Sequence, residues 1–228
     1  MWQHLSPPWR ACLEEAWAAY CAGSIPVGAV VTDAGGEILT RGRNRSFERD
    51  GAAFPVQVSP LAHAEAAALA ALDYARVDPH LCVLLTSQEP CPLCLGALYM
   101  SGVRELRYAG RDPYAGSVDL LGTTPYLRRK PIRVVPPSWP LLEAVVSAVT
   151  AEFGIRYGFA ASTAWESVWL PAWREAMPES VALAEDLYRS GWLDAQRAAG
   201  VPAQIVFDGV AARAGEGHRG ADRGGRGG

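Results

Sequence analysis

Long apolar runs are missing from this sequence. No uninterrupted apolar stretch approaches the ~20 residues that a membrane-spanning helix needs. Residues 1–8 also lack the basic start and following apolar stretch of a secretory signal. We therefore expect a soluble, cytoplasmic protein with no membrane partner.

An excess of positive charge is missing as well. The chain has 21 Lys and Arg residues against 24 Asp and Glu residues, a formal net charge of −3. Proteins whose main task is to hold long duplex nucleic acid usually show a clear basic excess, so the composition argues against that role. Of the 228 residues, 50% are hydrophobic and 20% are charged. This is ordinary for a globular protein and excludes a fully disordered chain.

Cysteine is scarce. The chain has five cysteines, at positions 12, 21, 82, 91 and 94. This odd number in a chain of such length does not suit a disulfide framework. It suits a reducing compartment and a metal site.

The pattern of apolar and turn-forming residues predicts strands separated by helices. Residues 27–31 and 37–43 are typical of a hairpin, and residues 44–60 of a long loop beside a functional site. The other predicted elements are helices at 7–22, 63–76, 91–101 and 141–153 and strands at 81–86, 103–109 and 132–135. Strands separated by helices imply crossover connections and a sheet that is covered on both faces.

After residue 158 the pattern changes. Further helices are predicted around a stripe of Trp165, Val168, Trp169 and Trp173, with Pro171 kinking or ending the first, and then at 179–189 and 192–199. From residue 211 the sequence is mainly Gly, Arg and Ala without apolar periodicity, so we expect a disordered tail. These changes predict a main domain at 1–158, a helical extension at 159–210 and a tail at 211–228.

Two short motifs carry most of the chemical information. Residues 63–65 read His-Ala-Glu at the start of a predicted helix, and residues 90–94 read Pro-Cys-Pro-Leu-Cys at the start of the next. Cys91 and Cys94 are three residues apart at a helix N-terminus, so both sulfurs can project to one side and the helix dipole favours their thiolate forms. Crossover connections can bring the two helix starts together, which places His63 near both sulfurs.

Three protein ligands leave one position of a tetrahedral zinc ion open for water, which is the pattern of a catalytic site. Glu65 is then placed to take a proton from that water and return it. The alternatives are a redox cysteine pair or a structural zinc site. A structural site needs another nearby ligand pair, which Cys12, Cys21 and Cys82 do not supply.

The two motifs match the H-x-E and P-C-x-x-C signature of zinc-dependent base deaminases. The chain resembles the cytidine deaminase-like superfamily, and within it the branch of bacterial guanine deaminases and tRNA adenosine deaminases. Residues 25–31, 42–45 and 86–99 are similar to that branch's first strand, the end of its second strand and its second zinc motif. The resemblance covers about residues 25–153 and leaves out 160–228.

The resemblance implies an α/β fold, a three-layer α/β/α sandwich around a mixed five-stranded sheet, here with a C-terminal helical extension. It implies a homodimer and the hydrolytic removal of an exocyclic amine from a base, with release of ammonia. By that analogy His63, Cys91 and Cys94 bind Zn²⁺ and Glu65 is the catalytic proton shuttle. The same analogy assigns substrate binding to the Asn44 side chain, the Ala64 backbone N–H and Asp112.

Some residues keep a second interpretation. Asn44 also suits a turn, and Asp112 suits an Asx turn before Pro113. Glu89 fits a role in bracing the loop better than a chemical one. The basic residues at 41, 43 and 45 and at 128–130 contact phosphates or form solvated surface, and the tryptophan stripe is a packing face or a lid over the pocket.

The leading hypothesis is a deaminase of a small-molecule nucleobase or nucleoside. One alternative is a tRNA adenosine deaminase, with nucleic acid as its partner. The other is a non-catalytic, zinc-stabilised interaction module. The sequence does not fix which base is deaminated.

Overall fold

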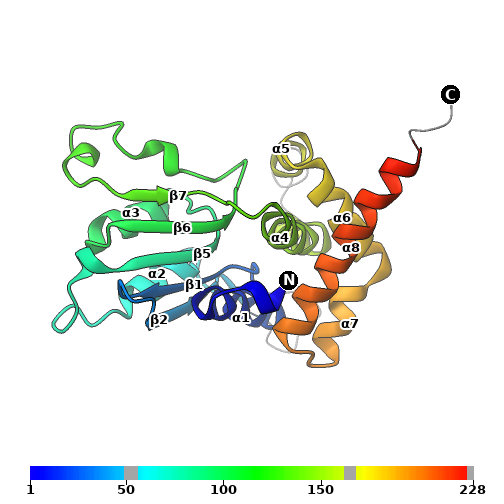
Figure 1. Ribbon diagram of the computed structural model, residues 1–228, viewed down its shortest axis with the longest axis horizontal. Coiled ribbons are helices and arrows are strands. Elements are labelled where there is room, and N and C mark those ends of the chain that lie inside the picture. The colour runs from blue at the N-terminus through cyan, green and yellow to red at the C-terminus, as the bar shows by residue number, and fades with distance from the viewer. Residues whose placement is uncertain (49–55, 162–167, 225–228) are drawn as a thin grey trace.

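The computed structural model describes residues 1–48, 56–161 and 168–224 (Figure 1). Its main sheet has five strands in the order β2-β1-β5-β6-β7. These strands are β1 (Gly28–Thr32), β2 (Ile38–Arg43), β5 (Val83–Gln88), β6 (Glu105–Gly110) and β7 (Arg133–Val135). β1 is antiparallel to β2 and to β5, whereas β5, β6 and β7 run parallel. The sheet is therefore mixed and five-stranded, as expected.

Helices cover both faces of this sheet. α2 (Ala64–Ala70) and α3 (Pro92–Ser101) pack on one face, and α1 (Pro7–Ala22) and α4 (Pro140–Ala161) pack on the other. Side chains of β1 alternate accordingly: Ala29 and Val31 join the core under α2, and Val30 joins the core under α1. The three-layer α/β/α architecture is confirmed.

Two glycines let helices approach the β1–β2 hairpin closely. A Cβ atom on Gly28 would lie 2.1 Å from the backbone oxygen of Cys12 in α1. A Cβ atom on Gly42 would lie 2.3 Å from the backbone oxygen of Ala64 in α2. The hairpin is thus held from both sides by backbone contacts that a side chain would prevent.

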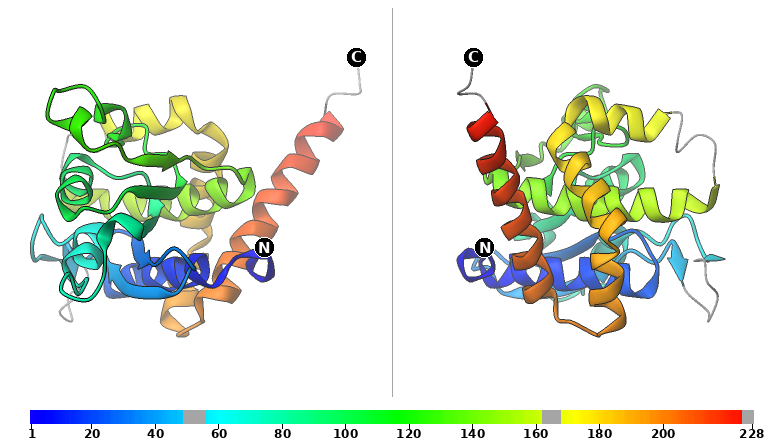
Figure 2. Two further views of the ribbon diagram at one scale, coloured as in Figure 1. Left: turned by 60° about the vertical axis from the view of Figure 1, so that its left-hand side comes forward. Right: turned by 90° about the vertical axis from the view of Figure 1, so that its right-hand side faces the viewer.

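The C-terminal helices form a further layer outside α4 and α1 (Figures 1 and 2). They are α5 (Leu170–Ala176), α6 (Pro178–Ser190), α7 (Trp192–Ala198) and α8 (Ala203–Gly224). One hydrophobic core joins Tyr20 of α1 and Phe153 of α4 to Leu187 of α6 and Phe207 of α8. The boundary expected at residue 158 falls inside α4, and the extension shares its core with the layer beneath it.

Several elements differ from the sequence-based expectations. The expected helix at 63–76 ends at Ala70, where the hydroxyl of Tyr74 donates to the backbone oxygen of Leu69. Pro171 lies in the first turn of α5, where its missing N–H costs nothing, so it neither kinks nor ends that helix. Trp165 lies outside the described residues. The strand expected at 81–86 begins two residues later, because a 3-10 turn with Asp78 as its cap precedes it.

A disordered tail is expected from residue 211, whereas the helix α8 continues to Gly224. The buried face of α8 formed by Ala203, Val206, Phe207 and Val210 at helical spacing lies before that stretch. The many glycines hid the continuation of this helix. The expected loop at 44–60 likewise contains two short strands, β3 (Phe47–Glu48) and β4 (Val56–Gln57).

Short 3-10 helices complete the fold: η1 (Trp2–His4), η2 (Pro79–Leu81), η3 (Val118–Leu120) and η4 (Leu127–Arg129). Within the described parts of the chain, no helix is both long enough and apolar enough to cross a membrane.

Candidate functional site

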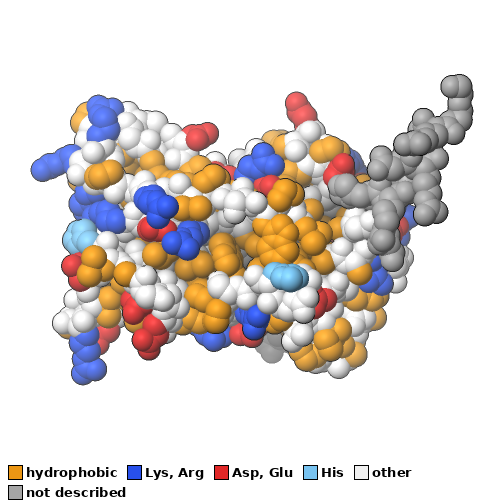
Figure 3. All heavy atoms as spheres, viewed as in Figure 1, with side chains coloured by type: hydrophobic (Ala, Val, Ile, Leu, Met, Phe, Trp, Pro, Cys, Tyr) orange, Lys and Arg blue, Asp and Glu red, His pale blue; other side chains and the backbone are white. Residues whose placement is uncertain are grey.

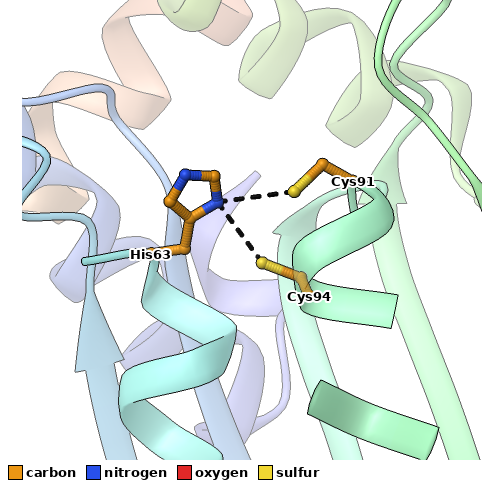
Figure 4. A group of neighbouring side chains, drawn as sticks. All are labelled: His63, Cys91 and Cys94. Atoms are coloured by element: carbon orange, nitrogen blue, oxygen red, sulfur yellow. Dashed lines mark hydrogen bonds between the residues drawn. The ribbon is translucent and has the colours of Figure 1, made fainter. Parts of the chain in front are cut away.

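The two sequence motifs meet at the N-termini of α2 and α3 (Figure 4). His63 is the residue that precedes α2, Cys91 precedes α3, and Cys94 lies in the first turn of α3. The ring Nδ1 of His63 lies 3.5 Å from Sγ of Cys91 and 3.4 Å from Sγ of Cys94. The structure therefore brings together the three residues that the sequence predicts as metal ligands.

These distances fit a zinc ion. Bonds of about 2.3 Å to sulfur and about 2.0–2.1 Å to nitrogen around a tetrahedral ion place the nitrogen and each sulfur about 3.5 Å apart. The ligand atoms of all three residues lie within 4.8 Å of one another. The triad thus presents two sulfurs and one nitrogen at the spacing of a tetrahedral zinc site with one protein ligand missing.

The electrostatics of the triad suit a cation. Hydrogen bonding from Cys94, with a further contribution from His63, lowers the pKa of the Cys91 thiol to about 4. The same contact with Cys91, together with burial, raises the pKa of Cys94. The pKa of His63 is raised, chiefly by its contact with Cys91. The cluster therefore holds a thiolate at neutral pH, and a cation there would release the remaining protons.

Glu65 lies directly beside the triad. One carboxylate oxygen, Oε2, is 3.1 Å from Sγ of Cys94, and the other, Oε1, accepts a hydrogen bond from the Thr86 hydroxyl at 3.0 Å. The side chain is 3% exposed. Burial raises the pKa of this carboxyl above its usual range. A carboxyl in this position can both take up and give back a proton.

A cavity of about 330 Å³ opens above the triad. Five of the site residues predicted from the sequence line it: His63, Glu65, Cys91, Asn44 and Asp112. Ala64 is fully buried and is not among the lining residues. The other lining residues are Ile25, Val27, Gln88, Glu89, Tyr114, Ala115, Thr150 and Trp169.

Asn44 is buried, and its side chain is held from one side. Its Oδ1 accepts hydrogen bonds from the Ser24 hydroxyl at 2.7 Å and from the backbone N–H of Ser46 at 2.9 Å. These two bonds fix the orientation of the amide. The Nδ2 group is then the part of this side chain available to donate to a ligand.

Asp112 forms the Asx turn that the sequence suggested. Its Oδ1 accepts from the backbone N–H groups of Tyr114 and Ala115, both at 3.0 Å. Burial raises the pKa of its carboxyl, an effect that these two hydrogen bonds oppose. Glu89 braces the same loop, as its carboxylate accepts from the backbone N–H groups of Asp112 and Val118.

Sequence reasoning missed several lining residues, of which Gln88 is the most constrained. Its Nε2 donates to the backbone oxygen of Arg111 at 2.6 Å, and its Oε1 lies 3.5 Å from the Thr150 hydroxyl. Gln88 stands two residues before the Pro-Cys motif at the end of a buried strand, which was a usable signal. Thr150 comes from a distant segment, and no local pattern points to it. Trp169 belongs to the tryptophan stripe, for which the sequence left open a packing face or a lid over the pocket.

Comparison with known proteins identifies the family. The model for the cytidine and deoxycytidylate deaminase zinc-binding region matches residues 6–109. A tRNA-specific adenosine deaminase of Aquifex aeolicus is 30% identical over 111 residues, which cover 48% of this chain and 68% of that protein. The chain belongs to the cytidine and deoxycytidylate deaminase family.

Other proteins resemble this family member in part. A tRNA(Ile)-lysidine synthase of Deinococcus radiodurans is 42% identical over 96 residues, which are 41% of this chain but only 15% of the synthase. A solved guanine deaminase from Nitrosomonas europaea has a TM-score of 0.46 and 27% identity, covering 66% of this chain and 85% of that one. The matched family region is a zinc-binding region, which agrees with the predicted cofactor and with the triad.

The basic clusters of this deaminase-family chain are partly neutralised. Arg41 pairs with Glu14, and both Arg43 and Arg45 pair with Glu48. Further Lys and Arg side chains gather at the end of the molecule that carries the sheet (Figure 3). There Arg107 and Arg133 pair with Glu105.

Proposed function

We propose that this chain is a zinc-dependent hydrolase that removes an exocyclic amine from a nucleobase or nucleoside. One water is consumed, the amine leaves as ammonia, and a carbonyl takes its place on the ring. The observation that carries the proposal is the position of the Glu65 carboxylate. Its Oε2 atom lies 3.1 Å from Sγ of Cys94, which is one of the three proposed metal ligands, and Glu65 also lines the cavity.

The residues divide the work as follows. His63, Cys91 and Cys94 would hold a zinc ion, which would lower the pKa of a bound water from ~15.7 toward ~7. Glu65 would accept one proton of that water and pass it to a ring nitrogen. It would then take the second proton from the new C–OH group and give it to the amine, which leaves as ammonia as the C–N bond breaks and the C=O bond forms. Proton transfer of this kind contributes roughly 10²–10⁴-fold to the rate.

The remaining contacts orient the ring. We assign to the Asn44 Nδ2 group a hydrogen bond to an acceptor on the base, because its Oδ1 is already used twice. The Asp112 carboxylate accepts from an N–H group of the ring. The backbone N–H of Ala64, in the first turn of α2, has no partner within that helix and donates to the ring edge.

Ammonia release from the zinc-loaded protein tests this function. The panel holds adenine, guanine, cytosine and their nucleosides, and zinc content is measured on the same sample. We expect turnover of at least one member, and a loss of roughly 10²-fold or more in Glu65→Gln with zinc retained. Near-wild-type release by Glu65→Gln would contradict the proton-shuttle role.

A tRNA adenosine deaminase is the second candidate, which the similarity to the Aquifex aeolicus enzyme favours. It requires tight, salt-sensitive binding of an anticodon stem-loop, which the first candidate does not. A non-catalytic interaction module would need no carboxylate at Glu65. The homodimer and the cytoplasmic location stay predictions, which light scattering and cell fractionation test.

A further inference from the structure

A tryptophan of the C-terminal helices lines the cavity. Trp169, the residue just before α5, is 6% exposed and belongs to the cavity wall. It lies far outside residues 6–109, the stretch that the family model matches. This part of the wall is therefore a feature of the extension and not of the zinc motifs.

The Trp169 indole is held in place by packing. It stacks on Trp173, with ring centroids 4.6 Å apart and planes inclined by 26°. Trp173 is fully buried, and the pair forms a core with Ala151 of α4 and Val181 of α6. α4 also supplies Thr150 to the cavity lining. The same helix therefore both lines the cavity and packs against the tryptophan pair.

No Lys or Arg side chain is available to a phosphate among the described residues that line the cavity. Its described lining includes three carboxylates, those of Glu65, Glu89 and Asp112, and no Lys or Arg. Arg111 precedes Asp112 in the chain, but its guanidinium is engaged by Glu143, with Nε 2.6 Å from Oε1. Phosphate groups are normally bound by Arg, Lys or backbone N–H groups, and carboxylates repel them.

We propose that Trp169 is a specificity-determining residue whose indole forms a stacking wall for a planar nucleobase or nucleoside that carries no phosphate. The inference rests on the function proposed for the same cavity. The inference restricts the proposed deaminase to uncharged ring substrates. It also assigns to the C-terminal extension a role in substrate specificity. Aromatic stacking suits this role because every base has a π-face.

The test measures kcat and KM for matched series of base, nucleoside and 5′-monophosphate. Wild type should favour the base or nucleoside over the monophosphate by about 100-fold or more in kcat/KM, because juxtaposed like charges cost several kcal/mol. Trp169→Leu keeps apolar bulk in the core and removes the aromatic face. It should raise KM for the preferred substrate about tenfold with a smaller change in kcat.

Two further variants separate stacking from folding. Trp169→Phe restores an aromatic ring and should stay within about threefold of wild type, since a smaller ring keeps most of the stacking. Trp192→Ala removes a tryptophan of α7 that contacts Arg213 instead of the cavity, and should leave KM unchanged. An unchanged KM in Trp169→Leu, or efficient turnover of the monophosphate, would overturn the inference.

Failure of the proposed function would look different. If no member of the series releases ammonia, calorimetric titration with the free bases still tests the wall. If a base binds to wild type and Trp169→Leu weakens this binding about tenfold, the stacking role of Trp169 is supported and the proposed deaminase activity is contradicted. Equal binding by the two proteins, or no binding to wild type, would reject the wall.

Discussion

Thr86 donates its hydroxyl hydrogen to Oε1 of Glu65 at 3.0 Å, inside the protein where both side chains are buried. Thr86 lies on β5 and Glu65 on α2, so the bond ties the central sheet to the helix that bears the proposed proton shuttle. The second carboxylate oxygen, Oε2, points toward Sγ of Cys94. The sheet thus sets which oxygen faces the metal ligands.

Thr86→Val should lower kcat roughly tenfold, because a hydrogen bond to a charged group contributes about 1.5–3 kcal/mol. Zinc content should stay at the wild-type level, since the Thr86 hydroxyl donates to Glu65, which is not one of the proposed ligands. Steady-state kinetics with parallel zinc analysis measure both. Thr40→Val on β2, whose hydroxyl donates to the backbone oxygen of Ala68, is the matched control. Equal kcat values in the two variants would contradict a positioning role for Thr86.

Cys91→Ser should strip the protein of zinc. Even residues that only support metal ligands cost about 10–100-fold in affinity or activity when changed, so loss of a ligand costs at least that much. Metal analysis after gel filtration in a competing chelator gives the zinc content. Cys21→Ser changes a cysteine of α1 that lies outside the triad and should keep the metal. Similar zinc loss in both variants would contradict the assignment of Cys91 as a zinc ligand.

Gly28→Ala should destabilise the fold by about 3 kcal/mol or more, the upper range for overpacking. The new Cβ would lie 2.1 Å from the Cys12 oxygen and 2.5 Å from the Ala16 nitrogen, both backbone atoms that cannot rotate away. Gly96→Ala is the control, because its Cβ meets nothing within 4 Å. It should stabilise α3 by about 0.5–1 kcal/mol. Urea unfolding measures both, and a stable Gly28→Ala variant would contradict the close approach.

Glu105 predicts a small pH dependence of stability. Burial opposes its ionisation, but hydrogen bonds from Arg107 and Arg133 hold its pKa below the usual value. A carboxyl with a lowered pKa in the folded state stabilises the protein above its unfolded pKa of about 4.3, and this stabilisation is lost as the pH falls through the folded value.

Glu105→Gln should therefore cost about 0.5–1 kcal/mol at pH 7, the range for ion pairs at the surface. The difference from wild type should shrink as the pH is lowered below 4. Urea unfolding of both proteins between pH 7 and pH 3.5 provides the comparison. A difference that grows toward acid pH would mean that the two arginines do not act through the Glu105 charge.

The proposed metal ligands could be predicted because each stands at a helix N-terminus. Helix geometry relates Cys91 to Cys94, three residues apart in α3, whereas the packing of α2 against α3 brings His63 to them. The order of strands and helices was predictable from the pattern of apolar and turn-forming residues. For Trp169 the sequence left open a packing face or a lid, because the place of this residue in the cavity lining depends on how the C-terminal helices pack against α4.

Composition also misled at one point. The Gly, Arg and Ala residues from 211 onward predict disorder, whereas α8, whose Val206, Phe207 and Val210 are buried just before them, continues to Gly224. The apolar face of α8 gains its stability from partners such as Trp17 and Tyr20, which lie about two hundred positions away in the sequence. Local propensity does not record such partners.

The shared interior of α1, α4, α6 and α8 limits how this protein can be dissected. Cutting the chain after residue 158, the domain boundary expected from the sequence, would bare Tyr20, Phe153 and the buried Glu152, which accepts a hydrogen bond from Tyr20 and pairs with Arg156. Such a fragment would expose a large apolar surface to water, and we expect it to aggregate before it can be assayed. Whatever the extension adds to catalysis must be learned by single-residue replacement in the intact polypeptide.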